Sequence, residues 1–167
     1  MATFVHLAPE KSIKSIRRSG IKPRLANPEL PRGVFAMPVT PDFYVSHQWL
    51  RELKRRGQRT LEAVYFKTPD DELVWIGHYN SESIQVTAAE ASGIVLEHES
   101  PEGYEVFIPR KIAAKEIHRT KHLPQVLGWR YYPGAKGRKP CGCPACQWRG
   151  EIKSQRIRRA YEAELRS

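Results

Sequence analysis

Short β-branched and aromatic segments recur through residues 1–108 of this chain, separated by prolines, glycines and only a few helical segments. The regular alternation of strand and helix that gives a parallel sheet is absent. The pattern therefore predicts an α+β fold built on a split, mostly antiparallel β-sheet. With 167 residues, the chain is long enough for one such core and a small appendage.

The stretch from Phe4 to Pro23 has the pattern of a short strand, a turn and a capped helix. Pro9 suits the first helical turn, because the N–H that proline lacks would have no partner inside the helix there. Gly20 stands where a left-handed C-cap residue belongs. The strand is expected to deliver His6 to its end, directly ahead of the helix.

A second strand and helix are predicted to follow. Gly33-Val-Phe-Ala-Met-Pro38 opens on glycine, closes on proline and is expected to be a strand. Thr40 before Pro41 is a strong helix start, a capping hydroxyl ahead of a proline at the first helical position. We expect this helix to run from about Asp42 to Arg56.

The remaining segments before residue 120 predict further strands and short helices. Two apolar runs flank a Thr-Pro-Asp-Asp turn, which favours an antiparallel hairpin. The expected elements are a hairpin of Leu61–Lys67 with Leu73–Tyr79, a turn capped by Thr87 and ending at Gly93, strands at Ile94–Glu97 and Tyr104–Ile108, and a short helix at Lys111–Arg119.

Positive charge is concentrated in the last third of the chain. Residues 1–108 contain 13 Lys or Arg and 14 Asp or Glu, a net charge of −1, whereas residues 109–167 contain 15 and 4, a net charge of +11. This imbalance predicts contact with a polyanion, with nucleic acid as the expected partner, although a basic tail can also serve solubility alone. We therefore expect a core domain at residues 1–119 and a basic appendage at residues 120–167.

Three cysteines, Cys141, Cys143 and Cys146, are clustered in this appendage. Tetrahedral Zn²⁺ takes four nitrogen or sulfur ligands, so the cluster predicts a structural zinc site that needs one more. His122 is the favoured fourth ligand and His118 the alternative. Free thiols, or a redox or iron–sulfur site, are the other interpretations.

The surroundings of the cysteines favour nucleic-acid contact. Arg138, Lys139 and Arg149 would neutralise phosphates, while aromatic residues such as Trp129 and Tyr131 would stack on bases. Alternatively, the tryptophans form a small core of the appendage. A final helix is predicted at Glu151–Leu165.

The chain begins without a charged segment followed by an apolar one, and no apolar run approaches the ~20 residues that a membrane helix needs. We therefore expect a cytoplasmic protein without a membrane partner, in which clustered cysteines serve as metal ligands or thiols rather than disulfides.

Three motifs, taken in order, resemble the ADP-ribosyltransferase superfamily on its diphtheria-toxin and poly(ADP-ribose) polymerase side. They are His6 on the first strand, Gly33-Val-Phe-Ala leading into the helix that carries Tyr44, and Tyr104-Glu-Val-Phe-Ile-Pro109 on a late strand. The resemblance covers about residues 4–118. It implies an ADP-ribosyltransferase-like core that uses NAD.

The resemblance also implies roles for individual residues. Glu105 would be the catalytic carboxylate that binds a ribose hydroxyl and stabilises positive charge as the nicotinamide bond breaks. His6 would hydrogen-bond the adenosine ribose, assisted by backbone amides at Leu7 and Ala8. An aromatic residue, from the set of Phe35, Tyr44, Phe43 and Trp49, would stack on nicotinamide.

Two departures from the family pattern bear on these roles. Tyr44 follows the Gly-aromatic strand at a longer interval than usual, so Phe43 or Trp49 is an alternative for the stacking position. Tyr104, before Glu105, replaces the second polar residue of arginine-modifying toxins, which argues against arginine as the acceptor.

The sequence therefore predicts an NAD-dependent ADP-ribosyltransferase that modifies a nucleic acid or a nucleic-acid-bound target. One alternative is a non-catalytic zinc-containing RNA- or DNA-binding module on the same fold. The other is an NAD enzyme similar to the RNA 2′-phosphotransferases, which carry basic residues in place of the glutamate.

Overall fold

A computed structural model describes residues 1–25, 31–79 and 81–131 of the chain. Its strands are β1 Ala2–Pro9, β2 Val34–Pro38, β3 Leu61–Thr68, β4 Leu73–His78, β5 Ile84–Thr87, β6 Tyr104–Ile108 and β7 Ile117–His122. They form one seven-stranded sheet in the order β5-β4-β6-β2-β1-β3-β7, and each strand pairing in it is antiparallel. The α+β class and the mostly antiparallel sheet are thus confirmed.

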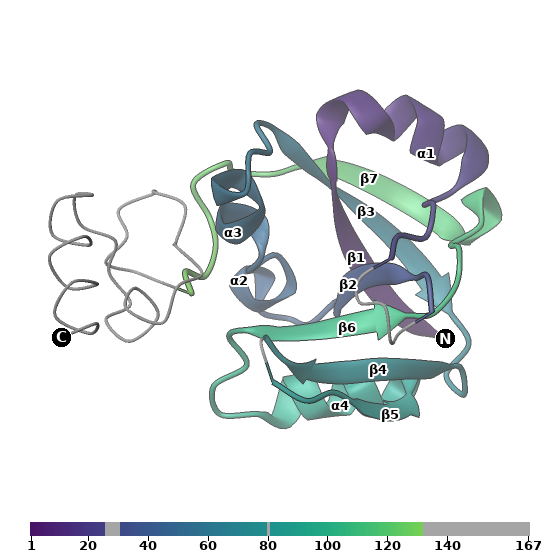
Figure 1. Cartoon of the computed structure of the whole chain (residues 1–167), viewed down its shortest axis with the longest axis vertical. Helices are drawn as coiled ribbons and strands as arrows, with labels where there is room; N and C mark the ends of the chain where they lie inside the picture. Colours follow the sequence, from purple (N-terminus) through teal and green to yellow (C-terminus); the bar gives the residue numbers. More distant parts are fainter. Residues whose placement is uncertain (26–30, 80, 132–167) are drawn as a thin grey trace, which may run out of the picture.

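The helices are short. They are α1 Ile13–Ser19, α2 Phe43–Ser46, α3 Leu50–Arg55 and α4 Ala88–Glu97, with 3₁₀ turns η1 Glu10–Ser12 and η2 Ala114–Glu116. Helix α4 lies along β4 and β5, whereas α1 lies at the β1-β3-β7 side of the sheet (Figure 1). Within the described part of the chain, no helix is long and apolar enough to span a membrane.

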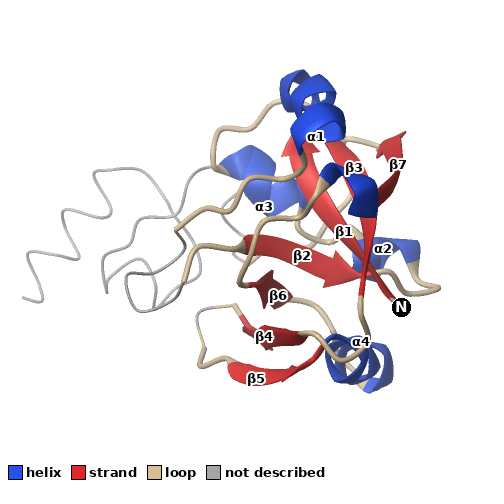
Figure 2. Ribbon diagram, turned by 90° about the vertical axis from the view of Figure 1, so that its right-hand side faces the viewer, coloured by secondary structure: helices blue, strands red, loops and turns tan. Residues whose placement is uncertain are grey.

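The sheet is split between β1 and β2. These strands pair only at Phe4–Pro38 and Val5–Met37, whereas β1 pairs with β3 along its whole length. Beyond Val5 the two strands diverge, so that β1, β3 and β7 form one part of the sheet and β2, β6, β4 and β5 the other (Figure 2). The gap between the parts is where the candidate site lies.

The core is densest around β3, which has a neighbouring strand on each side. Its side chains are buried on both faces except at Lys67, as expected of a strand covered on both sides. Phe66 stacks on Phe4 of β1 with the ring centroids 6.1 Å apart, and neither ring is accessible to solvent. Strand β1 therefore has its more extensive contact with β3, and only its first half also pairs with β2.

Two capping predictions are confirmed. Gly20 ends α1 with a φ of 80°, and its N–H donates to the Ile16 carbonyl over 2.8 Å. A Cβ at this position would lie 2.1 Å from the Ile112 carbonyl oxygen, so glycine is required. Thr87 caps α4 in a reciprocal capping box with Glu90.

The predicted hairpin is wrong. Strand β3 pairs with β1 and β7, and β4 pairs with β5 and β6. The Thr68-Pro-Asp-Asp turn therefore connects the two parts of the sheet rather than two paired strands. Strand partners are chosen by long-range packing, which a local turn signal does not report.

In two segments the secondary structure differs from the prediction. Ile94–Glu97 is the end of helix α4, which passes through Gly93, where an added Cβ would meet no other atom. Lys111–Arg119 is not a helix, because most of it forms η2 and the start of β7. Arg119 lies opposite Tyr65 of β3, so the edge of the sheet overrides the helical tendency of this segment.

The helix expected from Asp42 to Arg56 is interrupted. Helices α2 and α3 are separated at residues 47–49, and the N-cap is Asp42 rather than Thr40. The Asp42 carboxylate accepts from the Tyr44 N–H over 2.8 Å, while the Thr40 hydroxyl bonds to the Asp42 carbonyl. A carboxylate at the N-cap accepts from a backbone N–H of the first helical turn, which is the role that the Thr40 hydroxyl was expected to have.

The domain boundary expected between residues 119 and 120 falls inside β7. The chain continues to pack against the core beyond it. Gln125 bonds through its side-chain amide to both backbone groups of Leu61. The Trp129 N–H donates to the Gln48 carbonyl over 2.7 Å. The described chain is thus one packed unit through Tyr131.

Candidate active site

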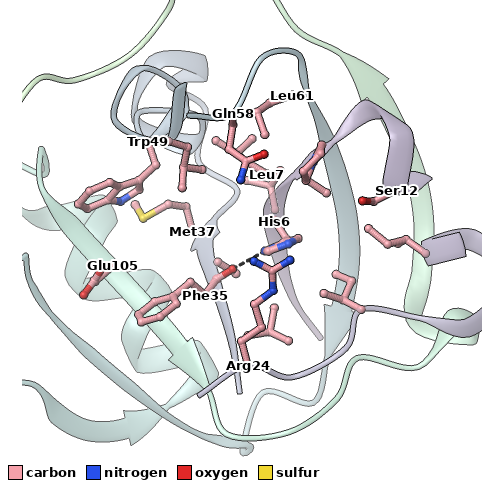
Figure 3. A pocket seen from close by; sticks show the side chains of 18 of the residues that line it. His6, Leu7, Ser12, Arg24, Phe35, Met37, Trp49, Gln58, Leu61 and Glu105 are labelled. Atoms are coloured by element: carbon pink, nitrogen blue, oxygen red, sulfur yellow. Dashed lines mark hydrogen bonds between the residues drawn. The ribbon is translucent and has the colours of Figure 1, made fainter. Parts of the chain in front are cut away.

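A cavity of about 600 Å³ lies in the gap between β1 and β2. Its walls come from β1, β2, α1, the segment that joins α1 to β2, and the region around α3. The residues that line it include His6, Leu7, Arg24, Phe35, Trp49 and Glu105 (Figure 3).

His6 lies within β1, directly after the last residue that pairs with β2, rather than at the end of the strand. Its Nδ1 is 2.7 Å from the Phe35 carbonyl oxygen, so the ring nitrogen donates across the gap between the strands. Burial lowers the pKa of His6 below its usual value, and the charge of Arg24 acts in the same direction against the Phe35 hydrogen bond. The ring is therefore neutral at pH 7, which leaves Nε2 as an acceptor for a ligand hydroxyl.

Glu105 comes from β6, the strand between β4 and β2, and lies opposite Gly77. Burial raises its pKa to about 7, although the charge of Arg56 acts in the opposite direction. The described residues donate no hydrogen bond to this carboxylate. The cavity therefore contains a carboxyl group that is poised near neutrality and available to a ligand.

Aromatic and cationic groups surround the Glu105 end of the cavity. The Trp49 indole N–H donates to the Tyr104 carbonyl over 2.7 Å, which ties the start of α3 to the residue before Glu105. Arg56 donates to the Tyr79 hydroxyl over 2.5 Å and lies over the Tyr79 ring. Aromatic rings and the Arg56 guanidinium therefore line the cavity near the Glu105 carboxyl group.

Gln48 holds the loop that leads into β6. Its side-chain oxygen accepts from the Gly103 N–H over 2.6 Å, and its side-chain nitrogen donates to the Pro101 carbonyl over 3.0 Å. Gln48 is fully buried, and Gly103 has a φ of 86°. The amide therefore fixes the backbone just before Glu105.

Arg24 stands at the opposite end of the cavity, beside His6 (Figure 3). Its backbone N–H and carbonyl both pair with Gly33, at 2.8 and 2.9 Å, which fixes the residue at the cavity wall. Lys22 also lines the cavity. These cations would suit an anionic group of a ligand.

Four of the expected site residues, His6, Leu7, Phe35 and Glu105, line this single cavity. Phe35 packs its ring on Phe107 with the centroids 5.1 Å apart. Tyr44 does not line the cavity and packs instead against the core from α2. Trp49 does line it, so the alternative for the stacking position has the better placement.

Sequence reasoning missed Gln48, Arg24 and Arg56. Glutamine and arginine on a predicted helix or loop are common surface residues, and no local pattern separates these from their neighbours. Only the proline and the glycine cap before Arg24 indicated that this segment turns back toward the core.

The predicted zinc and nucleic-acid residues lie mostly outside the described part of the chain. Cys141, Cys143, Cys146, Arg138, Lys139 and Arg149 all follow residue 131. His122 is described, and its Nδ1 lies 3.3 Å from a carboxylate oxygen of Glu62. Its role as the fourth ligand of a cysteine site stays a prediction.

The described aromatic residues of the expected appendage belong to the core unit. Trp129 packs edge-to-face on Trp49, and Tyr131 packs edge-to-face on Tyr79, with centroid separations of 5.4 and 4.8 Å. Both side chains are half-buried. They extend the aromatic wall near Glu105 rather than forming a separate core.

The cavity as a whole suits a ligand that combines hydroxyl groups, an aromatic ring and an anionic linkage. A neutral imidazole acceptor and Arg24 stand at one end, and an aromatic wall with a carboxyl group at the other. Comparison with family models, curated proteins and solved structures found no match to this chain.

Proposed function

We propose that this protein is an NAD-dependent ADP-ribosyltransferase. The observation that carries the proposal is the convergence of His6, Phe35 and Glu105. These residues are far apart in the sequence, yet they come from the adjacent strands β1, β2 and β6 and line one cavity. This convergence supports the resemblance of the three ordered motifs to the ADP-ribosyltransferase superfamily.

The two ends of the cavity would bind the two halves of NAD. His6 Nε2 accepts a hydrogen bond from the adenosine ribose, and the backbone of Leu7 contributes beside it. Arg24 interacts with the diphosphate, because a guanidinium donates readily to phosphate oxygens. Trp49 is the favoured partner of the nicotinamide ring, since Tyr44 is outside the cavity wall.

Glu105 would serve the bond-breaking step. The bond between ribose C1′ and the nicotinamide nitrogen breaks, and its electron pair leaves with nicotinamide. The ribose gains oxocarbenium character, which the ionised Glu105 stabilises while it accepts from a ribose hydroxyl. The acceptor then forms its bond to C1′ and releases its proton to solvent.

The proposed acceptor is a nucleic acid or a target bound to one. The support is the concentration of positive charge after residue 108, including Arg138, Lys139 and Arg149. The cations at the cavity wall, Lys22, Arg24 and Arg56, keep an RNA 2′-phosphotransferase-like reaction as the second candidate. Glu105 weighs against that reaction, since those enzymes use basic residues at its position.

The test is incubation of the full chain with labelled NAD and a panel of DNA, RNA and protein acceptors, including RNA with a 2′-phosphate. We expect transfer of label with release of nicotinamide, and a loss of about 10²–10³-fold in Glu105→Gln. Glu99→Gln, an exposed position outside the cavity, is the matched control. The proposal fails if NAD neither binds nor turns over, or if Glu105→Gln is as active as the control.

A further inference from the structure

A second group of ligand-type side chains lies at the end of the sheet where β1, β3 and β7 run side by side. Glu62, near the start of β3, lies opposite Ala8 of β1 on one side and His122 of β7 on the other. Glu10 directly follows β1, and its N–H donates to the Thr60 carbonyl over 3.1 Å. The sheet register therefore fixes the backbone of all three residues.

The donor atoms of Glu10, Glu62 and His122 all lie within 4.8 Å of one another. Glu62 is only 6% exposed, whereas Glu10 and His122 are exposed. No described residue donates a hydrogen bond to the Glu62 carboxylate, and its one polar partner is the His122 imidazole, 3.3 Å away. A buried carboxylate beside a second carboxylate is unfavourable unless a cation compensates the charge.

We propose that Glu10, Glu62 and His122 bind a divalent transition-metal ion, with Zn²⁺ as the reference ion. One imidazole nitrogen and two carboxylate oxygens form a donor set that zinc accepts, and the exposed side leaves a position for water. Mg²⁺ and Ca²⁺ prefer oxygen ligands alone, so the imidazole disfavours them. The site does not involve the residues proposed to bind NAD, but it uses His122, which therefore cannot also complete the predicted cysteine site.

The ion would join three strands beside the cavity. Pro9 and Leu61, the neighbours of Glu10 and Glu62 in the chain, both line the cavity wall. Bound metal would therefore restrain the strand ends that form this wall. A ligand that binds only the folded chain also stabilises it, so Zn²⁺ should raise the melting temperature.

The test uses the full chain with Cys141, Cys143 and Cys146 replaced by serine, so that the cysteines cannot bind metal. Isothermal titration with Zn²⁺ should show one saturable site per chain, and Mg²⁺ should not compete. Glu62→Gln and His122→Gln should each weaken zinc binding by at least about tenfold. Glu99→Gln and His98→Gln, exposed carboxylate and histidine positions outside the cluster, should bind zinc as the parent chain does.

Two results would overturn the site. One is the lack of saturable zinc binding in the serine-substituted chain. The other is zinc binding that is lost in His122→Gln but unchanged in Glu62→Gln, which would show that Glu62 is not a ligand. If serine substitution prevents folding, zinc is counted in the cysteine-containing chain, where Glu62→Gln must remove one ion per chain.

Discussion

Burial of Glu105 makes the stability of the fold depend on pH, at a residue that the proposed reaction also needs. Burial raises its pKa in the folded chain from 4.5 to about 7. Between these values the folded state holds a proton that the unfolded state has released, so stability falls as pH rises through this window. The group that the proposed reaction needs in its ionised form is therefore the group whose neutral form the fold favours.

Glu105→Gln should accordingly be more stable than the wild-type protein at high pH. Above pH 7 the variant no longer holds a buried charge, so the free energy of unfolding should rise by about 1–3 kcal/mol at pH 8. Below pH 4.5 both side chains are neutral and the difference should vanish. Urea unfolding at pH 4 and pH 8 measures it, and an equal difference at both pH values would contradict the raised pKa.

Activity should follow the opposite pH dependence. Since the proposed role needs the ionised carboxylate, kcat/KM for NAD should rise with pH through about pH 7. Arg56 lowers the pKa of Glu105, so Arg56→Gln should move this rise to higher pH. Arg59→Gln, an exposed arginine outside the cavity wall, should leave the profile in place. A profile that is flat between pH 6 and pH 8 would show that Glu105 does not act as an ionised group.

At the scale of the elements, the break between α2 and α3 places two residues that shape the cavity and the loop before β6. It places Gln48 in the core, where one side-chain amide holds the loop before β6. It also places Trp49 at the cavity wall, with its indole bonded to the Tyr104 carbonyl. The continuous helix that the sequence predicted did not indicate that Gln48 would be buried.

Gln48→Met should weaken both stability and activity. The change leaves the Gly103 N–H and the Pro101 carbonyl without their buried partner, at a cost of about 1–3 kcal/mol. Because this loop positions Glu105, kcat should fall more than the affinity for NAD. Gln85→Met, at an exposed position of β5, is the matched control. Unchanged kcat in a folded Gln48→Met variant would limit Gln48 to a structural role.

Local sequence patterns predicted the helix caps and some strands better than they predicted which strands pair. The caps at Gly20 and Thr87 and the strand after Gly33 each depend on nearby residues, and each is present. Strands β3 and β4 were expected to pair because a turn joins them, but their partners lie far along the chain. The ordered motifs named His6 and Glu105, which line one cavity, but their roles stay predictions. No sequence pattern indicated that Arg24 lines the cavity or that Gln48 holds the loop before β6.

For the whole molecule, charge is distributed unevenly along the chain. Residues 1–108 are near neutral, and the excess of positive charge follows them. The chain packs on the core through Tyr131, whose N–H donates to the buried Glu52 carboxylate over 2.9 Å. A cut that separates core from basic region therefore belongs after residue 131 rather than after residue 119.

Removal of residues 132–167 should abolish polyanion binding and leave NAD hydrolysis intact. In the full chain, affinity for single-stranded nucleic acid should fall with salt at a log–log slope of about −0.7 for each phosphate contact. Charge reversal at Arg138, Lys139 and Arg149 should weaken all sequences alike. Fluorescence anisotropy at several salt concentrations measures the affinity of each chain for nucleic acid and its salt dependence. Equal binding by residues 1–131 and the full chain would show that the basic region does not capture the polyanion.

The order of strands in the sheet also determines when the sheet can be completed during synthesis of the chain. Strand β6 is the sixth along the chain, yet it lies between β2 and β4 and is the link between the two parts of the sheet. Until residue 108 has left the ribosome, no strand pairing joins β4 and β5 to β1, β2 and β3. Pairings of such large sequence separation form slowly. A nascent or prematurely terminated chain therefore lacks the strand that completes the sheet, and with it Glu105, the carboxylate of the proposed reaction.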